Sequence, residues 1–170
     1  MDTSFIHHSY NIWNTSWLNE VVELQAMSFL IILEVDKNSV EGVFYTIKDA
    51  GFSNLYLKPD KKTIATYISE LKEAVIVEPM ISRAPVRKLK NVMIPRLEKI
   101  LVDLYCDDEL FFAFQGSQLV KIFEGCFEKY LINFSTMFNY ARRRHREDTL
   151  KEFLDNHFPA KVKEILNDQD

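Results

Sequence analysis

The sequence predicts an α/β fold, in which a small, mostly parallel sheet with crossover helices is followed by a helical C-terminal part. Two observations lead to this prediction. Strand-like and helix-like segments alternate in the first half of the chain, which is typical of parallel strands joined by right-handed crossovers. After residue 92 the apolar side chains recur only at helical spacing. We expect residues 1–158 to form a single domain, with 93–158 as its helical half, because 170 residues suit one core.

Four segments of the first half have the character of strands. Ser9 to Trp13 is a short candidate, and Phe29 to Leu33 is a continuous apolar run. Such a run is typical of a central strand that is covered on both faces. Asn54 to Leu57 and Ala74 to Val77 are the other two candidates. The segments between them favour helices, which gives the alternating order of a parallel sheet.

Three helices are expected between these strands. Thr15 is placed to cap the first and Asp60 opens the third. The second covers residues 40–50, where apolar side chains recur at helical spacing after the capping residue Ser39. Gly51 is expected to end that helix in the left-handed conformation, which glycine adopts without strain.

The second half is predicted to begin with a loop and continue as helices. Residues 80–92 are polar and basic without a clear period, so we expect a loop there. Pro95 suits the first turn of a helix. A further helix covers residues 115–131, and Asn133 is placed to cap the next one. Residues 159–170 are expected to fray.

The cellular setting follows from the apolar runs and the thiols. No run reaches the roughly 18 to 20 apolar residues that a bilayer-spanning helix needs, and the opening residues lack the pattern of a secretory signal. We therefore expect a cytoplasmic protein that does not bind membranes. Cys106 and Cys126 lie in apolar helical segments and are expected to be buried thiols, not a disulfide.

The motifs of common catalytic sites are missing from the sequence. It has no glycine-rich phosphate loop, no nucleophile elbow and no paired cysteine motif. His7 and His8 are adjacent, so an extended segment would point them in opposite directions. His145 and His157 have no partner at ligand spacing. We therefore expect a protein that is not an enzyme, with no catalytic residue, no cofactor and no metal site.

Two alternatives to this expectation remain. Glu34 and Asp36 would project to the same side of one strand, and Glu78 follows another strand. Carboxylates of this kind can hold Mg²⁺ for phosphodiester hydrolysis, which makes a metal-dependent nuclease-like enzyme the first alternative. A structural oligomerisation domain is the second.

Basic residues gather in two clusters, although the whole chain has a net charge of -4. The first cluster lies between residues 83 and 99 and contains Arg83, Arg87, Lys88, Lys90, Arg96 and Lys99 against Glu98 alone. The second lies between residues 129 and 146 and contains Lys129, Arg142, Arg143, Arg144 and Arg146 without an acidic residue. This segregation predicts binding surfaces, because guanidinium and ammonium groups recognise carboxylates and phosphates.

The second cluster is expected on a helix. A continuous helix would place Arg142, Arg143 and Arg146 on one side, and it would place Arg143 and Arg144 four residues before acidic residues. This leaves Arg142 and Arg146 as the pair that is available for a partner. From the residues alone, the second cluster is either an ordinary solvated helix face or a docking surface, and as a docking surface it suits an acidic protein first and nucleic acid second.

Several short blocks resemble a known bacterial family. The blocks are Trp13 to Glu20, Val40 to Tyr45, Pro79 to Pro85, Ile94 to Asp107 and Phe138 to Arg144. They are similar to a family related to the antitoxins of abortive-infection, AbiE-type toxin-antitoxin systems. The similarity extends over nearly the whole chain.

The resemblance implies a regulatory protein without catalytic residues. Antitoxins of that kind have a winged-helix DNA-binding domain before a larger domain, they repress their own operon, and their partner toxin is a nucleotidyltransferase. This chain resembles the larger C-terminal domain, and the residues before Trp13 are too few for a winged helix. DNA reading is therefore not implied, whereas a nucleotidyltransferase toxin or another acidic protein is the expected partner.

Overall fold

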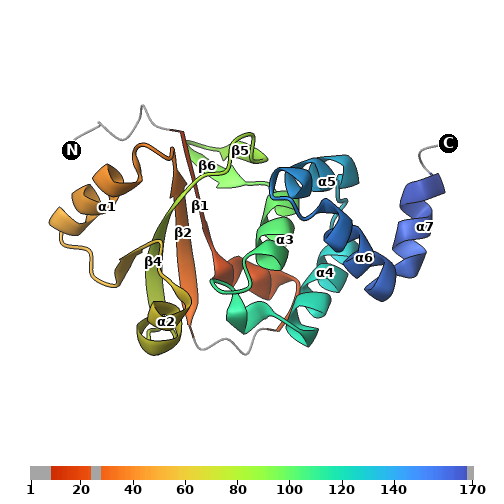
Figure 1. Cartoon of the computed structure of the whole chain (residues 1–170), viewed down its shortest axis with the longest axis horizontal. Helices are drawn as coiled ribbons and strands as arrows, with labels where there is room; N and C mark the ends of the chain where they lie inside the picture. Colours follow the sequence, from red (N-terminus) through yellow and green to blue (C-terminus); the bar gives the residue numbers. More distant parts are fainter. Residues whose placement is uncertain (1–8, 24–27, 168–170) are drawn as a thin grey trace. The chain divides into compact units, whose positions relative to one another are not determined.

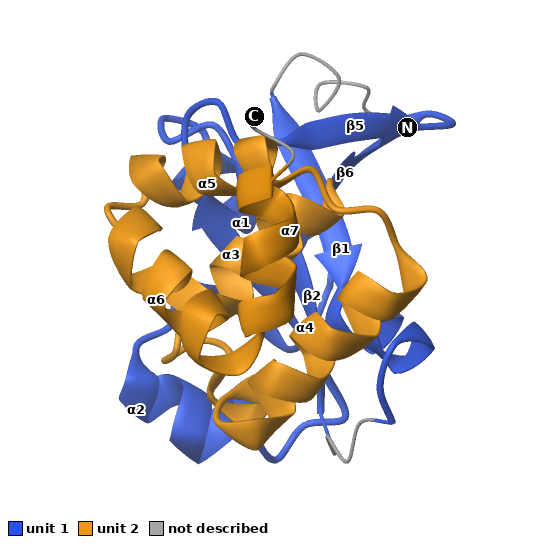
Figure 2. Ribbon diagram, turned by 90° about the vertical axis from the view of Figure 1, so that its right-hand side faces the viewer, with its two compact units in different colours: residues 1–95 blue, residues 96–170 orange. Residues whose placement is uncertain are grey.

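The computed structural model describes residues 9–23 and 28–167, which form two compact units (Figure 2). Unit 1 comprises residues 1–95 and unit 2 comprises residues 96–170. The sequence predicted one domain with a helical half beginning at residue 93. The boundary lies at residue 96 instead, because residues 92–95 form a strand that pairs within unit 1.

Unit 1 alternates strands and helices as predicted. Its elements are β1 (Tyr10–Asn14), the 3-10 helix η2 (Thr15–Glu20), β2 (Phe29–Val35), α1 (Val40–Asp49), β3 (Leu55–Leu57), α2 (Lys61–Thr63), the π-helix η3 (Ile64–Ile68), β4 (Glu73–Pro79), β5 (Val86–Leu89) and β6 (Val92–Pro95). The first four strands form one sheet and the last two form another.

The four-stranded sheet has the order β1-β2-β4-β3 (Figure 1). β4 runs parallel to both β2 and β3, while β1 runs antiparallel to β2. The predicted α/β class with a mostly parallel sheet is therefore confirmed. β2 is central, as its apolar run predicted, because it pairs with β1 on one side and with β4 on the other.

One face of this sheet packs against α1. Val35 and Val77 from the sheet form a buried cluster with Val40 and Val43 of the helix. These helix positions are three residues apart, so they lie on the same side and enter the core together. Gly51 ends the segment with a φ of 87°, which confirms the predicted left-handed stop.

The first helical segment differs from its prediction. Residues 15–20 form a 3-10 helix, and its capping residue is Asn14, whose side chain accepts a hydrogen bond from the Ser16 N–H at 2.8 Å. Thr15 is buried instead, and its Oγ1 accepts a hydrogen bond from the Leu30 N–H at 2.9 Å. Thr15 therefore supplies an acceptor to the sheet and does not cap a helix.

The segment predicted as a loop at residues 80–92 contains most of a β-hairpin. β5 and β6 pair antiparallel, with Leu89 opposite Val92 and Val86 opposite Pro95. Pro95 is thus the last residue of a strand and not the first turn of a helix. The prediction was wrong because a hairpin forms through pairing between two segments that each lack a strong strand pattern.

The regular elements among the described residues of unit 2 are all helices, as the sequence predicted. Its elements are α3 (Leu97–Cys106), the 3-10 helix η4 (Phe112–Phe114), α4 (Ser117–Lys129), α5 (Phe134–Arg143), α6 (Glu147–His157) and α7 (Pro159–Asn167). Residues 159–167, which were expected to fray, form α7, and this helix begins beside an aromatic cluster. In that cluster the Phe158 ring centroid lies 5.1 Å from that of Phe127 and 6.4 Å from that of Phe123.

Within residues 9–23 and 28–167, no helix is both long and apolar enough to span a membrane.

Candidate docking surface

The basic hairpin consists of residues 83–95, and it presents four of the six residues of the first basic cluster to solvent. Arg87 and Lys88 lie on β5, Lys90 lies in the turn between β5 and β6, and Arg83 precedes β5. All four side chains are exposed. The structure therefore brings four of the six predicted residues of the first cluster together on one segment, whereas Arg96 and Lys99 belong to unit 2.

Two of these basic residues have an unusual backbone conformation. Arg83 has a φ of 58° and Lys90 has a φ of 54°. Glycine and asparagine adopt the left-handed region more easily, because a longer side chain crowds the backbone there. Arg83 and Lys90 thus occupy two positions whose left-handed backbone conformation would favour glycine or asparagine. Backbone strain of this kind is common at functional sites.

The charge of the hairpin is not neutralised by the described parts of the chain. Arg83, Arg87, Lys88 and Lys90 form no ion pair with any residue in 9–23 or 28–167. No acidic residue occurs in the sequence between Glu78 and Glu98. The hairpin also exposes apolar side chains, since Leu89 is 49% and Val92 is 42% exposed. A partner that binds the hairpin would therefore contact basic and apolar side chains together.

The second basic cluster has a different geometry from the one predicted. α5 ends at Arg143, and His145 has a φ of 57°, so residues 142–146 do not lie on one helix. Arg142 pairs with Glu147 at 2.5 Å, whereas Arg143 had been assigned that partner. The Arg146 guanidinium lies 5.8 Å from the ring centroid of Tyr105. The prediction that Arg142 has no ion-pair partner was therefore wrong.

Arg144 of the same cluster belongs to a buried charge network centred on Asp103. The Asp103 carboxylate accepts hydrogen bonds from Lys99 Nζ at 2.5 Å, the Tyr140 hydroxyl at 2.7 Å and Arg144 Nη1 at 2.5 Å. Lys99 and Tyr140 are almost completely buried. Burial by itself lowers the pKa of Arg144, but the interactions of its guanidinium with Asp103, Tyr140 and Cys106 together outweigh burial and raise that pKa above its ordinary value.

This network joins α3 to α5 within unit 2, and sequence reasoning missed it. Lys99 had been counted in the first basic cluster, although it is buried on α3. One signal was present, because Lys99 and Asp103 have the i, i+4 spacing of a helical ion pair. Their burial among apolar neighbours could not be read from that spacing.

The Glu147 carboxylate gives a testable pH dependence. Hydrogen bonds from Arg142 and Lys151 lower the pKa of Glu147 to about 2. A carboxylate with a lowered folded-state pKa adds stability that is complete above its unfolded-state pKa and is lost as the pH falls towards the folded-state value. We expect Glu147→Gln to cost about 0.5–1 kcal/mol at pH 7, because the bridge is near the surface and screened by solvent.

Urea unfolding of the wild type and of Glu147→Gln from pH 7 down to pH 2.5 checks this expectation. The difference in unfolding free energy between the two proteins should shrink as the pH falls below about 4.5. A difference that stays constant over this range would contradict the assigned role of Glu147. Glu152→Gln, an exposed glutamate on the same helix, is the matched control.

The carboxylates of the nuclease alternative are arranged differently from the prediction. β2 ends at Val35, so Asp36 lies beyond the strand, where its Oδ1 accepts a hydrogen bond from the Asn38 N–H at 2.9 Å. Glu34 is buried and stands in register with Glu78 of β4. Among residues 9–23 and 28–167, no three histidine, cysteine or acidic side chains come together to hold a metal ion.

Cys106, Cys126 and His157 belong to unit 2. Cys126 is buried and Cys106 is partly buried, and both are free. Burial raises the pKa of the Cys106 thiol to about 11 and that of Cys126 to about 12. His157 packs against Phe153, with ring centroids 4.8 Å apart. The predicted behaviour of His7 and His8 falls outside the described residues.

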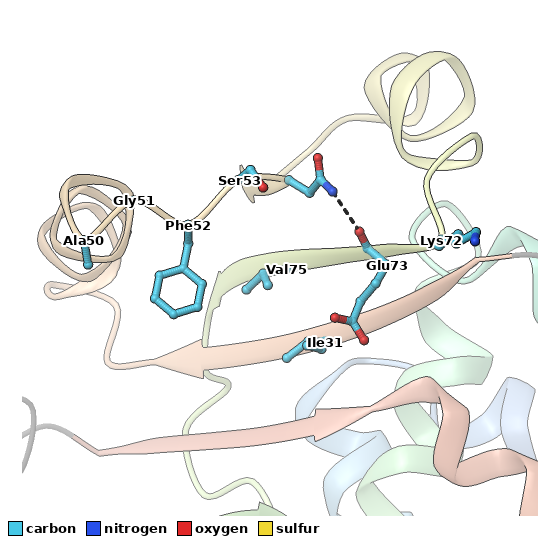
Figure 3. Close-up of a pocket in the computed structure, with 9 residues that line it drawn as sticks. Ile31, Ala50, Gly51, Phe52, Ser53, Lys72, Glu73 and Val75 are labelled. Carbon is cyan, nitrogen blue, oxygen red and sulfur yellow. Dashed lines mark hydrogen bonds between the residues drawn. The ribbon is translucent and has the colours of Figure 1, made fainter.

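Unit 1 also contains an open cleft of about 580 Å³ (Figure 3). It lies between the segment after α1 and the start of β4, where the Asn54 side chain donates a hydrogen bond to the Glu73 carbonyl oxygen at 3.4 Å. Phe52 is 62% exposed beside it. The cleft is at the amino-terminal ends of β2 and β4, whereas ligands of open parallel sheets bind beyond the carboxyl ends. The basic hairpin is therefore the stronger candidate site.

The fold and the site together define a mixed α/β protein with a helical C-terminal unit and an exposed basic hairpin. Comparison with known families shows that the chain belongs to the family of unknown function DUF6577, whose sequence pattern matches residues 1–160. No curated protein and no solved structure shows significant similarity to the chain.

Proposed function

We propose that this chain is a non-catalytic, antitoxin-like regulatory module of the bacterial cytoplasm that docks an acidic partner protein on its basic hairpin. The observation that carries the proposal is the exposure of Arg87, Lys88 and Lys90 without an ion pair to any described residue. Long-range attraction between such a surface and an acidic partner speeds association and fixes its orientation.

The contrast between the two basic clusters supports this choice of surface. In the second cluster, Arg142 and Arg144 are already paired with carboxylates of unit 2. The hairpin cations have no such carboxylate among the described residues, so an ion pair with a partner's carboxylate would stabilise a complex more there than at Arg142 or Arg144. The resemblance to AbiE-related antitoxins suggests a nucleotidyltransferase toxin as one partner of this kind.

A protein partner also suits the hairpin better than a nucleic acid does. The chain as a whole has a net charge of -4, and a long polyanion would be repelled by its acidic remainder. Leu89 and Val92, which are exposed beside the basic side chains, offer contacts that a phosphate backbone does not use. A short acidic stretch of protein would match the basic and the apolar groups.

The test compares two charge-reversed variants in affinity capture from native cells, with and without nuclease. In the hairpin variant, Arg87→Glu is combined with Lys88→Glu. The matched control is Lys61→Glu with Lys62→Glu, since these residues are also exposed, basic and part of unit 1. We expect the hairpin variant to recover the partner about tenfold less than the wild type does, and the control to behave like the wild type.

Two results would contradict the proposal. One is equal recovery of every captured protein by the wild type and the hairpin variant. The other is a capture that disappears on nuclease treatment, because the hairpin would then be reading nucleic acid. Recovery of an acidic protein that resists nuclease and depends on Arg87 and Lys88 would support it.

A further inference from the structure

β5 is an open strand edge. Within the described part of the chain, the sheet that contains it has two strands, β5 and β6 (Figure 2). β6 also lies close to β1, so β5 is the outer of the two strands. No backbone hydrogen bond joins β5 to any described residue other than those of β6. An edge of this kind can accept a further strand, since its outward N–H and C=O groups are not used in the sheet.

The register shows which backbone groups point outward. Pro95 has no N–H, so its pair with Val86 cannot be one of the doubly hydrogen-bonded pairs of an antiparallel ladder. Because the two kinds of pair alternate, the pair of Lys88 and Met93 is also of the non-hydrogen-bonded kind. The N–H and C=O groups of Val86 and Lys88 therefore point away from β6.

We propose that β5 binds an extended acidic segment of the partner protein by strand addition, through the outward backbone groups of Val86 and Lys88. This inference rests on the proposed docking function and specifies how docking occurs. Carboxylates of the added strand would lie beside Lys88 and Arg87, and opposite charges on neighbouring strands stabilise the pairing. The exposed Leu89 side chain would contact an apolar residue of the segment.

The positive charge of β5 distinguishes among the ligands that could bind its open edge. A second copy of this chain would bring two basic β5 strands together, and like charges on neighbouring strands are destabilising. A nucleic acid has no amide groups with which to continue the ladder. An acidic peptide in extended conformation matches both the charge and the hydrogen-bonding pattern, so it is the occupant to which the structure points.

The test uses two synthetic peptides and variants of the full chain. The probe peptide alternates glutamate with valine and threonine, and carries a fluorescent label. The control peptide has the same sequence but is N-methylated at alternate backbone amides. The methylation keeps the charge and removes the N–H groups that would donate hydrogen bonds to β5. We expect fluorescence anisotropy to show binding of the first peptide and about tenfold weaker binding of the second.

Val86→Pro removes one outward N–H without changing the charge. Val86 is the first residue of β5, a position where proline is tolerated in strands. We expect Val86→Pro to weaken binding of the probe peptide about threefold to tenfold, and Val86→Thr, which keeps the N–H, to change it less than about twofold. Unchanged thermal unfolding of both variants establishes that they fold.

Hydrogen exchange gives a residue-level result. On addition of the probe peptide, the amides of Val86 and Lys88 should exchange more slowly, while that of Arg87, which faces β6, should change less. Three results would overturn strand addition, namely no binding of the probe peptide, equal binding of the N-methylated peptide, and no effect of Val86→Pro. If charge reversal of Arg87 and Lys88 still abolishes partner capture, the proposed function stands without this mode of docking.

Discussion

Asp103→Ala is expected to lower the free energy of unfolding of unit 2 by about 3–5 kcal/mol. The Asp103 carboxylate accepts hydrogen bonds from Lys99, Tyr140 and Arg144. The Lys99 side chain is 0% exposed and that of Arg144 is 20% exposed. Removal of the carboxylate deprives both cations of this charge partner in a region shielded from water, and such a loss is costly.

Urea unfolding measured with two signals checks this prediction. Far-ultraviolet circular dichroism reports mainly on the helices of unit 2, whereas both tryptophans, Trp13 and Trp17, belong to unit 1 and report by fluorescence. We expect the circular dichroism transition of Asp103→Ala to move to a lower urea concentration. The slope of the transition should be preserved if the folded state keeps its compactness.

Two further variants separate the charge from other effects. Asp103→Asn keeps an acceptor for the Tyr140 hydroxyl but removes the negative charge, so it should also be strongly destabilising. Asp155→Ala removes an exposed helical carboxylate of unit 2 and should change stability by less than about 0.5 kcal/mol. A change below about 1 kcal/mol for Asp103→Ala would mean that the network contributes little.

Phe123→Ala is expected to cost about 3–5 kcal/mol, because it opens a cavity in the aromatic core of unit 2. Phe123 is 0% exposed on α4. Its ring centroid lies 5.8 Å from that of Phe127 and 5.2 Å from that of Phe153, both in edge-to-face geometry. Aromatic pairs of this geometry add to the free energy gained from burial alone.

Amide hydrogen exchange would show which helices are destabilised by Phe123→Ala. Phe158, which precedes α7, stacks on Phe123, so exchange in α7 should accelerate along with the loss of global stability. Phe112→Ala is the matched control, since Phe112 is 48% exposed in the same unit. If the two variants were equally stable, Phe123 would not be a core residue.

The sequence predicted the sheet better than it predicted the hairpin. The apolar run of β2 and the helical period of α1 are local signals that point in the same direction as the final fold. β5 has no such signal, because Arg87 and Lys88 interrupt it and the turn at Lys90 lacks the glycine that marks many tight hairpins. Its existence depends on pairing with β6, which a scan along the chain does not detect.

The candidate site was predicted in composition but not in geometry. The exposed charges of the hairpin follow directly from its residues, whereas the second cluster depended on a helix continuing through residue 146. α5 ends because His145 adopts a left-handed conformation that glycine or asparagine usually supplies, so the sequence contained no stop signal. The partner of Arg144 is Asp103, 41 positions earlier, and only tertiary structure brings them together.

β3 and β5, which are both edge strands of unit 1, differ in how they resist aggregation. β3 has only three residues and is flanked by Asn54 and Lys58, which have φ values of 56° and 41°, so it offers little backbone for a foreign strand. β5 is longer, and its lysine and arginine side chains discourage indiscriminate pairing. Replacing Arg87 and Lys88 by neutral residues would therefore remove a protection against self-association. Charge reversal, which retains repulsion between copies, is the sounder choice for experiments on this surface.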